Sequence, residues 1–189
     1  MSEAPRATAF AAREAEQDDH MSLLDRFTGT RHPDPSVPPR PTQEVRAALL
    51  AVGGPDVPYV VREGAGGGAD LVAEWRIREP AWHGFFARAK VSRSLETRMR
   101  LVPEKREVRA LDREWEVTWV GDRPRLVLSA EYSRGQVRSV SRSWTVDRGP
   151  DGKIRFTEDY RFDTAEMKTP LQEAVLGAGW TWRGALFRL

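Results

Sequence analysis

The chain of 189 residues contains no cysteine, and histidine occurs only three times. Disulfides, thiolate nucleophiles, iron–sulfur clusters and cysteine-ligated zinc sites are therefore excluded. His20, His32 and His83 stand far apart in the sequence, and none has a second ligand at metal spacing. Since G-x-S-x-G, Walker and H-E-x-x-H motifs are also missing, we expect no metal, no cofactor and no assignable catalytic residue.

Long apolar runs are also missing. The longest uncharged stretches, such as 47–55, are far shorter than the roughly 18 apolar residues that a membrane-spanning helix needs. The N-terminus carries Glu3 and Pro5 where a signal peptide has a basic start. We therefore expect a cytoplasmic protein without a transmembrane segment. Whether translation starts at Met1 or at Met21 stays open.

Neither sign of charge dominates, because 30 Lys and Arg residues face 28 Asp and Glu residues, for a formal net charge of +2. A nucleic-acid-binding surface gathers positive charge on one face. Here the signs interleave, as in 105–109 and 113–116. This pattern predicts solvated, mutually paired charges and argues against a nucleic-acid partner.

Proline is concentrated in one segment, 31–41. Such a segment is extended and buries little surface. We therefore divide the chain into a flexible N-terminal arm with a proline-rich spacer, 1–41, and a single β-rich globular domain, 42–189. A short apolar stretch within the arm, 22–27, is expected to dock on the domain or on a partner.

The domain is expected to open with a short helix at 42–52, capped by Thr42. Beyond it the apolar period becomes two, so that Leu126 and Leu128, for example, are expected on the inward face of a strand. Segment 82–89 fits either a strand or a helical turn. Short connections between the strands indicate antiparallel hairpins. The pattern predicts an α+β fold with a mostly antiparallel, strongly curved or barrel-like sheet of about eight or nine strands.

A C-terminal helix is predicted at about 164–176, with Lys168 and Gln172 on its polar side. Pro170 lies too deep for the first turn of this helix and predicts a kink or the start of a second helix. Segment 180–187 is then expected to form a final strand that packs into the structure.

Seven tryptophans are the most unusual feature of the composition. In a single-core β domain they mostly serve packing, and the alternative is an aromatic-lined cavity for a small apolar ligand. Polar candidates for such a cavity are two tyrosines and one glutamate on the predicted strands. The candidate ligand-binding residues are Trp75, Trp115, Trp119, Tyr132, Glu158 and Tyr160.

Glu158 interrupts an otherwise regular strand pattern. Period two places it on the same face as Phe156 and Tyr160, and a carboxylate in an apolar row must be paired, protonated or near a cavity mouth. Three interpretations stay open: a bond to an arginine or tyrosine of the sheet, a polar group that serves a ligand or acts as a general acid, and a β-bulge that turns the side chain outward.

Segments 70–77, 105–119 and 170–184 resemble those of a family of uncharacterised actinobacterial proteins, and the resemblance covers about 22–189. It implies that the domain is a recurring unit, and it carries no known activity. In architecture alone, a strand-rich roll with a late apolar helix is similar to the tubby and scramblase-like lipid-binding barrels.

We therefore predict a non-enzymatic binding or interaction domain, for a small apolar ligand or for a protein partner. The alternatives are a small enzyme of a cone-shaped α+β fold that uses carboxylate and tyrosine groups in a pocket, or a lipid-binding barrel. A cavity of several hundred Å³ would favour a ligand or an enzyme, and a filled interior would favour protein interaction. The oligomeric state stays open.

Overall fold

The computed structural model describes residues 28–185 and 189 apart from 90, 122, 129–139 and 149–153, and it describes the backbone alone for 140–148 and 154–162. The elements in chain order are α2 (Thr42–Val52), β1 (Tyr59–Gly66), β2 (Ala69–Trp75), α3 (Pro80–Arg88), β3 (Arg93–Val102), the 3₁₀ helix η1 (Pro103–Lys105), β4 (Glu107–Val120), β5 (Arg123–Leu128), β6 (Val140–Arg148), β7 (Ile154–Asp163), α4 (Ala165–Leu176) and β8 (Thr181–Gly184).

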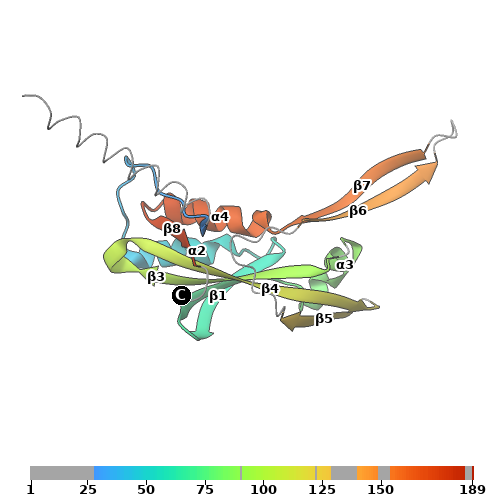
Figure 1. Cartoon of the computed structure of the whole chain (residues 1–189), viewed down its shortest axis with the longest axis horizontal. Helices are drawn as coiled ribbons and strands as arrows, with labels where there is room; N and C mark the ends of the chain where they lie inside the picture. The colour runs from blue at the N-terminus through green and yellow to red at the C-terminus, as the bar shows by residue number, and fades with distance from the viewer. Residues whose placement is uncertain (1–27, 90, 122, 129–139, 149–153, 186–188) are drawn as a thin grey trace, which may run out of the picture.

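The main sheet has six strands in the order β1-β2-β3-β4-β5, with β8 parallel to the first part of β4. Strands β6 and β7 form a separate two-stranded hairpin that projects from the start of α4 (Figure 1). The α+β class and the mostly antiparallel order are confirmed. The single barrel-like sheet of eight or nine strands is not confirmed, because the sheet is open and β6 pairs with β7 instead of extending it.

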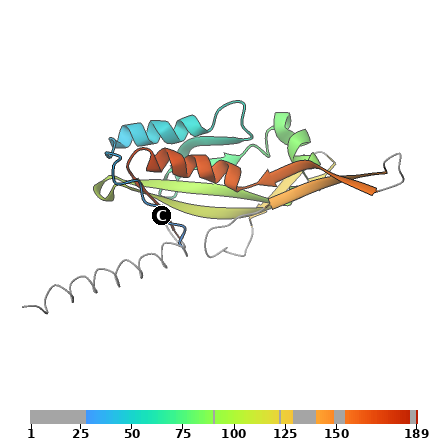
Figure 2. The ribbon, with the colours of Figure 1, turned by 90° about the horizontal axis from the view of Figure 1, so that it is seen from above.

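Helices α2 and α4 lie side by side on one face of the main sheet (Figure 2). Their apolar stripes pack on the inward side chains of the strands, and the bulky Trp182 of β8 is fully buried in this layer. We call the opposite side of the sheet the open face. The core side chains that the helices contribute are Val45, Leu49, Met167, Leu171 and Val175.

The N-terminal helix has the bounds that the sequence predicted, but Thr42 is not its cap. Pro41 occupies the N-cap position, Thr42 is the first helical residue, and no described side chain caps the helix. Segment 82–89 is helical and belongs to α3. Within the described part of the chain, no helix combines the length and the apolar character needed to cross a membrane.

The structure excludes one of the two alternatives predicted at Pro170 and corrects the predicted polar side of the C-terminal helix. Pro170 lies inside one helix, α4, and no second helix starts there. Lys168 and Gln172 are not on a solvated side, because they are only 7% and 4% exposed. Lys168 reaches Asp112 of β4, and Gln172 is buried as well, so the buried stripe of α4 is wider than its apolar residues indicate.

The proline-rich segment makes backbone hydrogen bonds to the C-terminal part of the chain. Arg31 and Trp182 exchange N–H···O bonds of 2.8 and 2.9 Å, and the Arg40 N–H donates to the Ala178 carbonyl at 2.9 Å. The Trp180 indole N–H also donates to the Arg40 carbonyl at 2.9 Å. The sequence pattern gave no signal for these contacts, because their partners lie far apart along the chain.

Candidate functional site

Trp75, the first candidate residue, packs in the core at the end of β2. It is 4% exposed, and its ring meets those of Tyr59 and Phe86 edge to face at centroid distances of 5.4 and 6.2 Å. Such T-shaped pairs stabilise the interior beyond the area that they bury. The geometry of Trp75 therefore accounts for a packing role, and its role toward a ligand stays a prediction.

Trp115 lies on the open face of the sheet, in β4. The Arg78 guanidinium carbon lies 5.6 Å from the centroid of its ring, which is a cation–π contact. Trp75, Trp115 and Leu126 are among the side chains that line a pocket of about 110 Å³ at this point. The volume is well below the roughly 300 Å³ at which sites for small organic ligands begin.

Trp119 connects two segments at the far end of β4. Its indole N–H donates to the Val91 carbonyl at 2.8 Å, and its ring packs against the core. The hydrogen bond fixes the α3–β3 connection to the β4–β5 hairpin. Trp119 lies four residues along β4 from Trp115. Its ring, a predicted cavity residue, makes packing and hydrogen-bond contacts within the fold.

The remaining candidates lie where side chains are not described. Tyr132 is outside the described residues, and only the backbone of Glu158 and Tyr160 is placed, in β7. The register between β6 and β7 shifts between Ser143 and Trp144, which lie opposite Tyr160 and Glu158. This irregularity breaks the period of two on which the common face of Glu158 and Tyr160 was inferred. Their assignment to a site stays a prediction.

A buried ion pair joins α4 to the inward face of β4. Lys168 Nζ binds Asp112 Oδ2, and the two side chains are 9% and 6% exposed. The Thr97 hydroxyl donates to the other carboxylate oxygen of Asp112 at 2.9 Å. Each charged group therefore has a partner within the protein, and this arrangement fixes the position of α4 on the sheet.

The outer edge of β5 presents backbone groups that no described strand pairs with. The Val117 N–H donates to the Ser92 carbonyl at 2.8 Å on the β3 side, so the backbone groups of Val117 point away from β5. Val117 lies opposite Leu126 in the antiparallel register, where facing residues either bond each other or both point outward. The N–H and C=O of Leu126, and those of Leu128 two residues further, therefore point away from β4. No other described strand pairs with β5.

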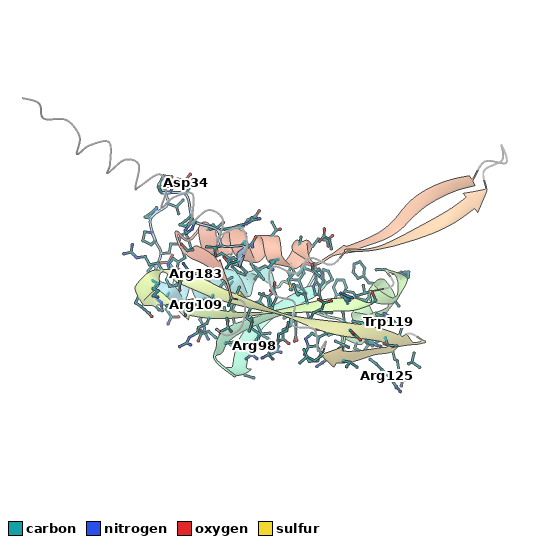
Figure 3. The ribbon with its side chains drawn as sticks, viewed as in Figure 1. Asp34, Arg98, Arg109, Trp119, Arg125 and Arg183 are labelled. Atoms are coloured by element: carbon teal, nitrogen blue, oxygen red, sulfur yellow. The ribbon has the colours of Figure 1, made fainter. Side chains whose placement is uncertain are left out.

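Apolar and basic side chains surround this edge. Val120, Val127 and Leu128 are 56%, 62% and 48% exposed, and they are the exposed large hydrophobic residues among those whose exposure is described. Arg123 and Arg125 of β5 are exposed as well. We refer to β5 together with Val120 as the β5 edge. Figure 3 shows Arg125 at this end of the sheet, beside Trp119.

The β5 edge was not predictable from the apolar pattern. That pattern predicts Leu128 on an inward face, whereas the structure exposes nearly half of the residue. The alternation of Leu126 and Leu128 was visible, but alternation does not say whether a further strand covers the edge. The available signal was the pair Arg123 and Arg125 beside Pro124, which is typical of an edge strand.

The described residues include no group of three or more His, Asp or Glu side chains that could hold a metal ion. Comparison with protein-family models, with curated protein sequences and with solved structures gave no match.

Proposed function

We propose that this chain is a non-enzymatic protein-interaction domain that binds an extended segment of a partner protein along the β5 edge. The observation that carries this proposal is the outward direction of the Leu126 and Leu128 backbone groups on an edge strand. An extended segment that pairs with such an edge forms main-chain hydrogen bonds, and neighbouring side chains provide specificity.

The side chains of the β5 edge support this mode of binding. Unprotected edges are a hazard for soluble proteins, which cover or charge them. In β5 the protection is confined to the first half, where Pro124 and the two arginines lie. The second half, Leu126–Leu128, leaves Val127 and Leu128 exposed beside outward backbone groups. This half is therefore the place where a partner strand would pair.

The charge of β5 favours an acidic partner over a second copy of this chain. The strand contains two arginines and no acid. Arg123, Arg125 and Val127 share one face, since they alternate along the strand. A second β5 would bring further arginines to this edge. A segment with alternating acidic and apolar residues can instead place its acids beside Arg123 and Arg125 on one face and its apolar residues beside Leu126 and Leu128 on the other.

The size of the pocket beside Trp115 favours a protein partner over a small apolar ligand. Its volume of about 110 Å³ accommodates a small chemical group and not a bulky apolar ligand. The pocket lies on the open face, which β4 and β5 share with Trp115 and Leu126. A side chain of a bound partner segment fits this volume better than a free ligand does.

Amide hydrogen exchange on the isolated protein tests the geometry first. The Leu126 and Leu128 amides should exchange quickly, and the Val127 amide, which points to β4, should be protected. A fluorescein-labelled synthetic peptide of alternating valine and glutamate should bind and should slow exchange at Leu126 and Leu128. A peptide of alternating valine and lysine should bind at least about tenfold more weakly, because it meets Arg125 with like charge.

Two substitutions at one position separate main-chain from side-chain binding. Leu128→Pro removes an N–H that β4 does not use and should weaken peptide binding about tenfold, whereas Leu128→Ala keeps the N–H and should lose less. Arg125→Glu should invert the preference between the two peptides. Slow exchange of Leu126 and Leu128 in the isolated protein, or equal binding by the proline and alanine variants, would refute the proposal.

A further inference from the structure

Three arginines lie side by side across neighbouring strands at the opposite end of β4. Arg100 of β3 lies opposite Arg109 of β4, and Arg109 lies in register with Arg183 of β8. Residues in register across a sheet share a face, and here it is the open face, because the adjacent Val108 and Trp182 are in the core. Figure 3 shows Arg109 and Arg183 next to each other, far from Arg125. We call this set the arginine row.

Arg109 of β4 and Arg183 of β8 share one buried carboxylate, that of Glu107. The Nε of Arg109 donates to Glu107 Oε1 at 2.7 Å, and the Nε of Arg183 lies 3.2 Å from Glu107 Oε2. Arg109 therefore uses one N–H in a hydrogen bond, and Arg183 is in ion-pair contact with the same carboxylate. The η nitrogens of both groups have no hydrogen-bond partner among the described residues. Arg100 is exposed and forms no ion pair within the same part of the chain. The row thus offers many donors that the described part of the chain does not satisfy.

A pocket lies between the arginine row and the turn that joins β3 to β4. Its volume is about 340 Å³, and Arg100, Lys105 and Arg109 line it together with the carboxylate of Glu104. This volume falls within the range of small-molecule sites, roughly 300–1,000 Å³. Lys105 is held at the end of the 3₁₀ helix η1, which begins with Pro103, so the cation sits on a short regular element.

We propose that this pocket binds the phosphate group of a small soluble molecule. Three cations against one carboxylate leave an excess of two positive charges in the pocket, and the adjoining Glu107–Arg183 pair adds none. A phosphate monoester carries about −1.5 to −2 at neutral pH, which matches this excess. Guanidinium groups bind phosphate oxygens with pairs of parallel N–H donors, and the η nitrogens of Arg109 are available for this.

Without bound anion in solution, the arginine row should destabilise the fold, and this sign distinguishes a binding role from a structural one. Arg100 and Arg109 face each other directly, and like charges in facing positions of a sheet repel. A bound phosphate would neutralise both. Without phosphate, Arg100→Gln should therefore raise the melting temperature by about 1–3 °C. A structural arginine would show the opposite sign.

The test uses the full chain with inorganic phosphate and with phenyl phosphate as probes, at constant ionic strength. Both probes should raise the melting temperature of the wild type in a saturable way, and calorimetry should give a single site. Arg100→Gln should weaken binding at least about tenfold. Arg62→Gln is the matched control, since Arg62 is an exposed arginine on the same face that pairs with Glu74 and lies outside the pocket. It should leave phosphate affinity unchanged.

Three results would overturn the proposal. The first is the absence of a saturable response to either phosphate probe. The second is an equal loss of affinity in Arg100→Gln and Arg62→Gln, which would indicate general charge screening. The third is binding to phosphatidylcholine vesicles that contain phosphatidic acid without any response to the soluble probes, which would assign the row to a membrane surface. None of these results depends on the β5 edge.

Discussion

The buried pair of Lys168 and Asp112 provides the sharpest test of how α4 is attached to the sheet. Both side chains are less than a tenth exposed, and the Thr97 hydroxyl also binds the carboxylate. Removal of one partner leaves an uncompensated charge in the interior, which costs about 3–5 kcal/mol. We therefore expect Lys168→Met to lower the free energy of unfolding by about 3–5 kcal/mol, although methionine retains most of the apolar volume of lysine.

The double variant Lys168→Met with Asp112→Leu separates the charge effect from packing. Since it removes both charges, it should regain most of the stability lost by either single variant, and replacement of such pairs by apolar residues is often neutral or stabilising. The exposed pair of Arg62 and Glu74 is the control, and Arg62→Met there should cost about 0–1 kcal/mol.

The free energy of unfolding of every variant can be measured by urea titration, with tryptophan fluorescence as the signal and linear extrapolation to zero urea. The coupling energy of the double-mutant cycle is then the quantity of interest. A loss below about 1 kcal/mol for Lys168→Met would refute the reasoning, because that value is typical of a solvated surface pair.

The remaining predictions concern Tyr59 and Gly179. Burial, with a contribution from the charge of Glu166, raises the pKa of Tyr59, so its contribution to stability is complete below about pH 10 and is lost as the pH rises through the folded pKa. Glu166→Gln should lower this pKa toward its ordinary value in an NMR titration of ring-labelled tyrosine, and an unchanged pKa would contradict the assignment. Gly179 has φ +70°, and an added Cβ would lie 2.7 Å from Pro39 Cα, whereas Gly68 has φ +81° and open space around it. Gly68→Ala should therefore cost about 1–2 kcal/mol in urea unfolding and Gly179→Ala clearly more, and equal losses would show that the spacer contact is unimportant.

Local features of the fold were predictable where a segment decides its own structure. The helix at 42–52 and the strand character of the main segments follow from apolar spacing and turn residues alone. The polar side of α4 was not predictable in this way. Lys168 is buried because Asp112, 56 positions earlier in the chain, supplies its counter-charge. No window of sequence around α4 contains that information.

The candidate site also combines features that the local sequence decides with features that distant segments decide. Tryptophan content directed the site prediction to β2 and β4, but the packing of Trp75 and the backbone hydrogen bond of Trp119 depend on partners from α3 and the α3–β3 connection. The β5 edge and the arginine row were not identified, because each is defined by which strands are neighbours. A residue pattern records which side chains share a face, and it does not record what covers that face.

The sequence by itself determined the absence of cysteine chemistry, the α+β class and the alternation within each strand, because these depend on composition and on neighbours within a few residues. Only the tertiary structure decided that β6 and β7 pair with each other, that β5 ends the sheet, and that Arg100, Arg109 and Arg183 lie in one row. Pairing and register depend on the free energy of contacts between distant segments, and many pairings satisfy the same alternation. The surfaces that carry the proposed functions therefore arise from the choice of strand partners.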